Sequence, residues 1–358
     1  MRESSIVVRP EPLGSPRYTE SSRLQAAGLL EATALFEQCA AQVPLPQAPQ
    51  PVVLVDYGAA TGHNSLVPVG TAIRTLRGRT RSEHAVLVVH TDIAENDFTA
   101  LFQTLADDPD SYLRNDAATF ASAVGRSFYG QILPSNSVTL GWSSWACQWL
   151  SRSPVPVPDH IQAACSADAD VRAAYARQAA HDWHEFVAFR GRELCPGGRL
   201  VVLTLAVDDD GEFGFRPVLD AILAGLDALC ADGFITADEL AGMSIPMASR
   251  SAKDFGVPFA PRDRFEDLVI EQVQVFHGED RAWTRYQADQ DRSAFGAHWA
   301  DLAGASVFPA LAASLDEARR PEFLGRLHAH VAAQLAAAPQ HIVIPLATVV
   351  LTKVGRPG

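Results

Sequence analysis

The clearest structural signal in the chain is a short β-branched run that ends in a turn of small residues. The run VVLVD at 52–56 is typical of a strand buried on both faces of a parallel sheet. The following YGAATG at 57–62 carries Gly58 and Gly62 into a helical stretch that ends near Arg77. Because ligands of open α/β sheets bind beyond the carboxyl ends of the strands, this turn is a candidate binding loop.

Strand and helix signals alternate along the rest of the chain. Further strands are predicted at 85–92, 137–143, 199–207, 268–276 and 341–351. Helices are predicted at 21–43, at 95–108 with Asn96 or Asp97 as the N-cap, and at about 170–194, where LCPGG stops the helix before the next strand. This alternation predicts an α/β fold, a doubly wound, Rossmann-like sheet of mainly parallel strands.

The chain is expected to divide into a core and a helical cap. Residues 1–210 are assigned to the core, including an N-terminal segment that gates the site. Residues 211–262 and 277–338 are mainly helical and are expected to cover the active site as a cap. Residues 263–276 and 339–358 are expected to supply the strands that complete the core sheet.

Composition narrows the class of protein. With 29 Lys and Arg against 42 Asp and Glu, the formal charge of −13 argues against a nucleic-acid partner. No apolar run reaches the roughly 20 residues of a membrane span, and the N-terminus shows no apolar region of a signal peptide, so we expect a cytoplasmic protein. Five cysteines without a CxxC pair indicate free thiols rather than disulfides or zinc. His181 and His184 share a helical face but lack further ligands, so no metal site is predicted.

The turn after Asp56 differs from the dinucleotide and P-loop motifs, because it lacks both the third glycine of GxGxxG and a GK[ST] sequence. Asp92 ends the next predicted strand, where a carboxylate can accept hydrogen bonds from ribose hydroxyls. An acidic turn with few glycines suits a cofactor without a pyrophosphate, such as S-adenosyl-L-methionine (SAM). The alternatives are an ordinary strand–turn–helix, an NAD(P) oxidoreductase, or a SAM-binding protein without activity.

Five ordered segments resemble the SABATH methyltransferases, which methylate carboxyl groups of small acids and, in some plant members, ring nitrogens of purine alkaloids. Residues 18–25, 56–66, 92–102, 125–134 and 143–151 are similar to SYxxNSxxQ, DLGCSSGPNTL, DLPxNDFNxLF, GSFYGRLFP and SSYSLxWLS, respectively. Weaker matches lie at 193–198 and 242–246. The match runs over nearly the whole chain, and the Ala-, Arg- and Asp-rich composition favours a bacterial member.

The resemblance implies a set of cofactor-binding residues in addition to Gly58 of the turn: Tyr18, Ser22, Asp56, Asn64, Asp92, Ile93, Ser127 and Phe128. Asp92 would hold the ribose, Asp56 and Ser22 would lie near the methionine moiety, and Ser127 and Phe128 would flank the adenine. The product of the cofactor would be S-adenosyl-L-homocysteine (SAH), and the protein would be a homodimer.

The resemblance also implies that Gln25 and Trp149 clamp the carboxylate of the substrate. Both are neutral donors that orient a carboxylate without drawing charge from its nucleophilic oxygen. Without the resemblance, Trp149 would be interpreted as a core aromatic and Gln25 as a surface residue. The pocket wall is expected to include Trp142, Trp145, Gln148, Phe215, Ile245 and Phe308. Because Trp142, Trp145 and Gln148 depart from the family pattern, the acid is left open between benzoate-type and medium-chain aliphatic acids, with N-methylation as the alternative reaction.

Overall fold

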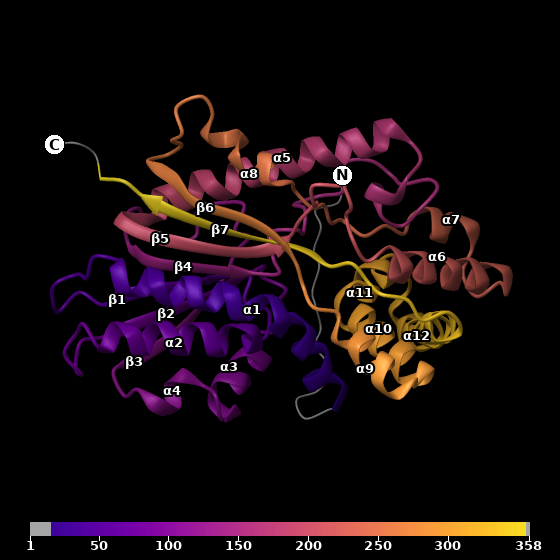
Figure 1. Ribbon diagram of the computed structural model, residues 1–358, viewed down its shortest axis with the longest axis horizontal. Helices are drawn as coiled ribbons and strands as arrows, with labels where there is room; N and C mark the ends of the chain where they lie inside the picture. The colour runs from indigo at the N-terminus through magenta and orange to yellow at the C-terminus, as the bar shows by residue number, and fades with distance from the viewer. Residues whose placement is uncertain (1–15, 356–358) are drawn as a thin grey trace.

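A seven-stranded sheet organises the molecule (Figure 1), which the computed structural model describes for the backbone of residues 16–355 and the side chains of residues 28–355. Its strands are β1 (Val52–Tyr57), β2 (Val86–Asp92), β3 (Thr119–Gly125), β4 (Val138–Ser144), β5 (Leu194–Leu205), β6 (Leu268–His277) and β7 (Pro345–Lys353). The order is β3-β2-β1-β4-β5-β7-β6. Strands β1 to β5 are parallel, whereas β7 runs antiparallel to both β5 and β6. The predicted α/β fold with a mainly parallel sheet is confirmed.

Twelve α-helices surround this sheet within the described residues. They are α1 (Pro16–Gln42), α2 (Leu66–Arg77), α3 (Phe98–Asp107), α4 (Tyr112–Asn115), α5 (Ala169–Glu193), α6 (Arg216–Ala231), α7 (Ala237–Ala241), α8 (Ala252–Gly256), α9 (Arg281–Asp289), α10 (Arg292–Ser306), α11 (Phe308–Ala312) and α12 (Arg320–Ala337). The N-cap of α3 is Asp97, the second of the two residues predicted as alternatives; its side chain accepts a hydrogen bond from the backbone N–H of Ala100.

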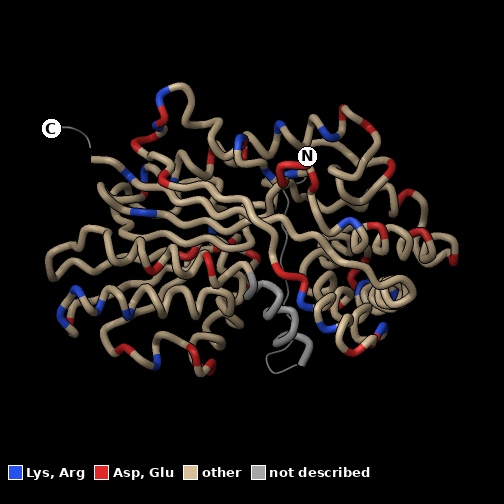
Figure 2. Tube along the Cα trace, in the orientation of Figure 1, with Lys and Arg blue, Asp and Glu red and all other residues tan. Residues whose placement is uncertain are grey.

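Strand β1 shows why the sheet is covered on both faces. Leu54 packs into a core shared with Phe36 of α1 and Ile73 of α2. Tyr57 faces the opposite core, where its ring lies 6.1 Å from that of Phe186 of α5. Since alternate strand residues point to opposite faces, the unbroken apolar run is buried by α1 and α2 on one side and by α5 on the other. Figure 2 shows that charged residues gather on helices and loops around a largely uncharged sheet.

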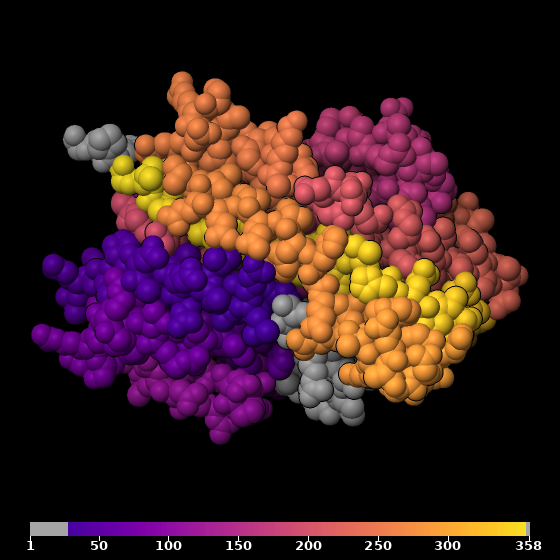
Figure 3. Space-filling view, in the orientation of Figure 1, coloured from indigo at the N-terminus to yellow at the C-terminus, as the bar shows by residue number. Residues whose placement is uncertain are grey.

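Helices α6, α7 and α9 to α12, which follow β5 and β6, gather at one end of the sheet, beyond the carboxyl ends of the parallel strands (Figure 1). Helices α6, α10 and α12 pack on one another there. At Gly296 of α10 a Cβ would lie only 2.2 Å from the carbonyl oxygen of Ala332 in α12, so only glycine permits this close approach. Figure 3 shows the 281–337 helices beside the N-terminal half, with β6 leading across this face into α9.

Helix α8 packs on the face of the sheet that α5 covers, away from α1 and α2. The indole of Trp183 in α5 donates a 3.0 Å hydrogen bond to the carbonyl oxygen of Phe255, and the two rings lie 5.1 Å apart. Within the 211–262 stretch predicted as cap, the α8 segment therefore packs on α5 and β6. The remaining domain boundaries stay a prediction.

Two local expectations differ from the structure. Strand β3 was not predicted, because it is an edge strand of small residues whose Phe120 is 56% exposed and gives no apolar run. The LCPGG segment ends α5 as predicted but already belongs to β5. There the pairing jumps from Val138–Leu194 to Leu140–Arg199, so the turn residues form an irregularity within the strand.

Candidate active site

A cavity of about 200 Å³ opens between the β1 turn, the turn after β4 and the cap helices. Strands β1 and β4 are neighbours at which the strand order changes direction, the usual ligand position in doubly wound sheets. Its polar end is formed by residues 58–65 of the β1 turn, and its other walls are mainly apolar side chains of the cap. None of the described residues that line it is Asp, Glu, Lys or Arg.

The β1 turn needs glycine at position 58. Gly58 has a φ of +85°, and a Cβ there would lie 2.3 Å from the Cβ of Ala146. The N–H groups of Gly58 and Ala59 each donate a 2.9 Å hydrogen bond to the carbonyl oxygen of Thr91 at the end of β2. The turn is therefore held against both neighbouring strands, and its backbone forms one wall of the cavity.

Asp92 lies directly behind this wall. Its two carboxylate oxygens accept hydrogen bonds from the N–H groups of Ala60, at 2.7 Å, and Ile93, at 2.8 Å. Burial raises the pKa of Asp92 to about 6, and the negative charge of Asp56 adds to this effect, whereas the two N–H donors oppose it. A carboxylate at a strand end with an elevated pKa is a typical feature of a functional site.

Asp56 occupies a different environment from the one expected. Its carboxylate is 1% exposed and does not line the cavity. One oxygen accepts a 2.5 Å hydrogen bond from the hydroxyl of Ser65 and lies 2.9 Å from Nδ1 of His90, whose Nε2 is bonded to the Tyr112 hydroxyl at 2.8 Å. Asp56 therefore supports the binding loop from below through Ser65, which does line the cavity.

The loop at 126–134 follows β3 and carries Ser127 and Phe128. Cε1 of Phe128 lies 3.3 Å from the position that a Cβ on Gly58 would take, so this ring stands against the β1 turn. Ser127 is exposed, and its hydroxyl accepts a 3.3 Å hydrogen bond from the N–H of Tyr129. The loop thus reaches the same edge of the sheet as Asp92 and Gly58.

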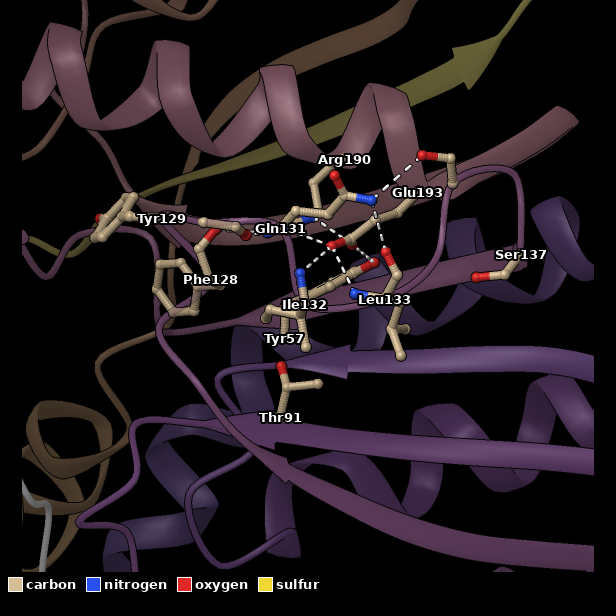
Figure 4. Close-up of polar contacts among 12 residues, drawn as sticks. Tyr57, Thr91, Phe128, Tyr129, Gln131, Ile132, Leu133, Ser137, Arg190 and Glu193 are labelled. Atoms are coloured by element: carbon tan, nitrogen blue, oxygen red, sulfur yellow. Dashed lines mark hydrogen bonds and ion pairs between the residues drawn. The ribbon is translucent and has the colours of Figure 1, made fainter.

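A buried ion pair holds this loop in place (Figure 4). Glu193 and Arg190 at the end of α5 are both fully buried and are 3.0 Å apart. Glu193 accepts hydrogen bonds from the N–H groups of Ile132 and Leu133 and from the Tyr57 hydroxyl. Arg190 donates to two carbonyl oxygens of the loop, those of Phe128 and Gly130. Because both charged side chains are buried, removing one of them would leave the other charge without compensation.

The turn after β4 carries two of the predicted pocket residues, Trp145 and Gln148. Trp145 lies in the left-handed region at φ +55°, which is unusual for a bulky side chain and occurs where surrounding contacts enforce it. Gln148 enforces it: its amide N–H donates to the carbonyl oxygen of Trp145 at 2.6 Å, and its amide oxygen accepts from Thr204 of β5 at 3.1 Å. The side chain of Gln148 is therefore engaged with the protein rather than free for a substrate.

Trp149 lines the cavity at the end of this turn. Its backbone forms an isolated bridge with Met247, and its carbonyl oxygen accepts a hydrogen bond from the Tyr129 hydroxyl. Within the described part of the chain, the indole N–H of Trp149 makes no hydrogen bond. The indole N–H of Trp145 is buried and equally without a partner. Of these two neutral donors, the indole N–H of Trp145 is enclosed by the protein, which leaves Trp149 as the candidate donor to a ligand in the cavity.

The predicted site residues, apart from three wall residues that lie in the core, fall into three groups. Those that line the cavity are Gly58, Asn64, Trp145, Gln148, Trp149 and Phe215. Asp92, Ile93, Ser127 and Phe128 lie behind it at the ends of β2 and β3, and Asp56 lies beneath it. The side chains of Tyr18, Ser22 and Gln25 lie outside the described residues, although α1 includes their backbone.

Three of the wall predictions are corrected by the structure. Trp142, Ile245 and Phe308 are at most 1% exposed and belong to the main core instead of the cavity lining. Trp142 sits in the middle of β4, where it packs on Phe36 of α1 with ring centroids 4.9 Å apart. A position inside a strand points to a helix layer, whereas the cavity begins only after the strand ends.

The cap supplies wall residues that sequence reasoning missed. They are Phe213, Val218, Leu219, Ile222, Met247, Leu302 and Val307. The helical spacing of Val218, Leu219 and Ile222 marks one apolar face of α6, but such a face is as typical of core packing as of a pocket. Phe215 is a second aromatic at positive φ, +56°, so the cavity has a constrained backbone at both ends.

Among the described residues, no group of three or more His, Cys, Asp or Glu is arranged to hold a metal ion. None of the described helices is both long and apolar enough to cross a bilayer.

A doubly wound sheet with a glycine turn after β1 and an acid at the end of β2 defines a nucleotide-cofactor enzyme of the Rossmann-like type. A sequence model of the family described as "SAM dependent carboxyl methyltransferase" matches residues 12–354. The chain therefore belongs to the SABATH family of SAM-dependent carboxyl methyltransferases, and SAM is its cofactor.

Similar proteins span several reactions. "Methyltransferase FUS9" of Gibberella moniliformis is 26% identical over 279 residues, 75% of each chain. "Probable caffeine synthase 3" of Coffea arabica is 24% identical over 351 residues, 89% of this chain and 90% of the relative. "Salicylate carboxymethyltransferase" of Clarkia breweri is 27% identical over 236 residues, 63% of this chain and 64% of the relative. A structure of "Loganic acid methyltransferase with SAH" shares the fold, with a TM-score of 0.78, 20% identity and coverage of 97% and 99% of the two chains.

Proposed function

We propose that this enzyme methylates the carboxylate of a small acid with an apolar body, giving a methyl ester and SAH. The observation that carries the proposal is the cavity itself. Trp149 presents an indole N–H without a hydrogen bond beside the β1 turn, and the cap walls around it are apolar. A carboxylate at the indole and a hydrophobic ring or chain among the cap side chains would satisfy both features.

The residues at the strand ends fit SAM. Gly58 leaves no room for a Cβ, so the backbone of the turn can approach a cofactor closely. Asp92 would accept hydrogen bonds from the ribose hydroxyls, and Ser127 and Phe128 would flank the adenine. Asn64 lines the cavity and would contact the cofactor together with Tyr18 and Ser22, of which the resemblance places Ser22 near the methionine moiety. Asp56 would act through Ser65 and the shape of the turn.

When bound, SAM supplies an electrophilic methyl group on a positively charged sulfonium. A carboxylate oxygen that attacks this carbon in line forms the new C–O bond while the C–S bond breaks and its electron pair returns to sulfur. The role of Trp149, together with Gln25, would be to orient the carboxylate for this attack. Holding two reactants in line contributes up to about 7–11 kcal/mol in favourable cases.

The reaction needs no general base, because a carboxylic acid with a pKa of about 4 to 5 is already ionised at neutral pH. Neutral donors suit this step, since a cation beside the carboxylate would stabilise the ground state more than the transition state. The negative charge of the carboxylate and the positive charge of the sulfonium are both neutralised as the methyl group is transferred. A cavity lined without charged side chains in its described part therefore favours the transition state over the separated charges.

A labelled methyl-transfer screen tests the proposal. The enzyme is incubated with methyl-labelled SAM and a panel of aromatic, aliphatic and terpenoid acids, with xanthines as nitrogen acceptors. Methyl esters release labelled methanol in alkali, whereas N-methyl products do not. Alkali-labile label on an acid is expected. Stable label on a xanthine alone would replace the proposal with N-methylation, the reaction suggested by the name of the Coffea relative.

The homodimer expected from the resemblance also remains a proposal. Light scattering coupled to size exclusion would give twice the 38.5 kDa chain mass if it is correct. A mass equal to one chain across the working concentrations would contradict it.

A further inference from the structure

The 126–134 loop contacts both halves of the site. On the cofactor side, the Phe128 ring stands against the β1 turn at Gly58. On the other side, the next residue, Tyr129, extends its hydroxyl to the carbonyl oxygen of Trp149 and donates a hydrogen bond to it. The two aromatic rings are in edge-to-face contact, with centroids 4.7 Å apart. One dipeptide therefore bridges the two binding regions.

The base of the loop is rigid. Glu193 accepts hydrogen bonds from the N–H groups of Ile132 and Leu133, and Arg190 donates to the carbonyl oxygens of Phe128 and Gly130. Figure 4 shows the dashed bonds converging on this pair, while Phe128 and Tyr129 point away from it. The contacts fix the backbone on both sides of Tyr129, so the direction of its side chain is also restricted.

The Trp149 backbone is also held from the 246–247 side. Its backbone N–H donates to the carbonyl oxygen of Ala146 at 3.0 Å, the N–H of Leu150 in the following peptide donates to the carbonyl oxygen of Pro246 at 2.8 Å, and Trp149 forms a bridge with Met247. Its partly buried ring packs against the main core. The Tyr129 hydroxyl is the bond that joins its peptide to the loop on the cofactor side. A rotation of this peptide would turn the indole, because the side chain follows its own backbone.

We propose that Tyr129 is a positioning residue that couples the cofactor loop to the substrate anchor. A cofactor packed on Phe128 stabilises the Phe128–Tyr129 ring pair in the position that it has here, and the Tyr129 hydroxyl then stabilises the Trp149 peptide and the direction of its indole N–H. Bound cofactor thus strengthens the binding of the acid, and by reciprocity the acid strengthens the binding of the cofactor. This inference rests on the proposed function, in which Trp149 holds the carboxylate.

Tyr129→Phe removes only the hydroxyl and keeps the ring contact with Phe128. Tyr175→Phe is the matched control: Tyr175 is buried and, like Tyr129, donates to a backbone carbonyl oxygen, that of Val155 at 3.3 Å, away from the cavity. Calorimetry measures the Kd of SAH, and then the Kd of benzoate and octanoate with and without saturating SAH. These readouts require no turnover.

The Tyr129→Phe enzyme is expected to bind SAH within about twofold of wild type, because Arg190 and Glu193 still hold the loop. Its affinity for the acid in the SAH complex should fall about three- to tenfold, the usual effect of one neutral hydrogen bond, and the enhancement by SAH should shrink with it. Tyr175→Phe should retain the full enhancement. An unchanged enhancement in Tyr129→Phe overturns the inference.

The Trp149→Phe variant distinguishes failure of the coupling through Tyr129 from failure of the proposed function. If Trp149→Phe weakens acid binding while Tyr129→Phe does not, the anchor stands and the coupling is wrong. If Trp149→Phe binds the acid as wild type does, the anchor is wrong and the coupling is overturned with it.

Discussion

Gly58 and Ala146 are so close that a methyl group on Gly58 would lie 2.3 Å from the Cβ of Ala146. The first residue belongs to the turn after β1 and the second to the turn after β4, so the two turns that line the cavity are in van der Waals contact. A side chain at position 58 would force the two turns apart.

Gly58→Ala is expected to destabilise the fold and abolish SAM binding. Gly211→Ala is the matched control, since Gly211 has nearly the same φ, +81° against +85°, but nothing within 4 Å of its added Cβ. Both variants bear the cost of a left-handed alanine, about 1–2 kcal/mol. Only Gly58→Ala adds steric overlap, about 1–3 kcal/mol more. Urea unfolding checks the difference, and equal losses in the two variants would contradict it.

SAM affinity is expected to fall as the pH drops through about 6. The pKa of Asp92 is raised to about 6, so the carboxyl group is ionised above this pH and protonated below it. A ribose diol needs the ionised acceptor, so binding releases a proton and the Kd should rise up to about tenfold per pH unit below 6. Calorimetry between pH 5 and 8 measures this, and Asp92→Asn should give a weak and pH-independent Kd. A pH-independent wild type would exclude the ribose assignment.

Trp149→Phe is expected to reduce kcat/KM for the acid while leaving the Kd of SAM unchanged. Loss of one hydrogen bond to a charged carboxylate costs about 1.5–3 kcal/mol, which corresponds to roughly 10- to 150-fold. Trp283→Phe on α9, outside the residues that line the cavity, is the control. Gln25→Ala should act in the same direction. Turnover near wild type in both Trp149→Phe and Gln25→Ala would contradict the proposal that these two residues bind the carboxylate.

Gln148→Leu is expected to affect stability rather than selectivity among acids. It would leave the Trp145 carbonyl oxygen and the Thr204 hydroxyl without their partner, at a cost of about 1–3 kcal/mol in the free energy of unfolding. Because Gln148 is engaged on both amide atoms, the ratio of kcat/KM for benzoate and 2-hydroxybenzoate should not change. A shift of more than fivefold in this ratio, with stability preserved, would show that Gln148 contacts the substrate.

Local patterns predicted a large share of the fold. The β-branched run that became β1, the glycine turn after it and the Asp97 cap of α3 each depend on residues adjacent in the chain. The SABATH blocks are ordered stretches of the same kind, so the family was recognisable before the packing was known. Strand β3 lacked such a signal, since an edge strand needs no apolar run.

The hydrogen-bond partners of Asp56 could not be predicted from local sequence patterns. His90 lies on the neighbouring strand β2, directly opposite Asp56 in the β1–β2 pairing. A buried run containing one histidine does not specify its partner, because the register of parallel strands is set by helices and connections distant in sequence. The same holds for Gln148, whose partner Thr204 comes from β5.

Residue order alone predicted the family of this enzyme, because the strand ends, their acids and the tryptophan after β4 are encoded in short contiguous segments. Only the folded chain decided where individual side chains lie. It placed Trp142 in the core and Trp149 at the cavity, and joined Tyr129 to Trp149 across 20 residues. Direction and burial of a side chain depend on which elements pack around it, and those contacts form only between segments far apart in the sequence.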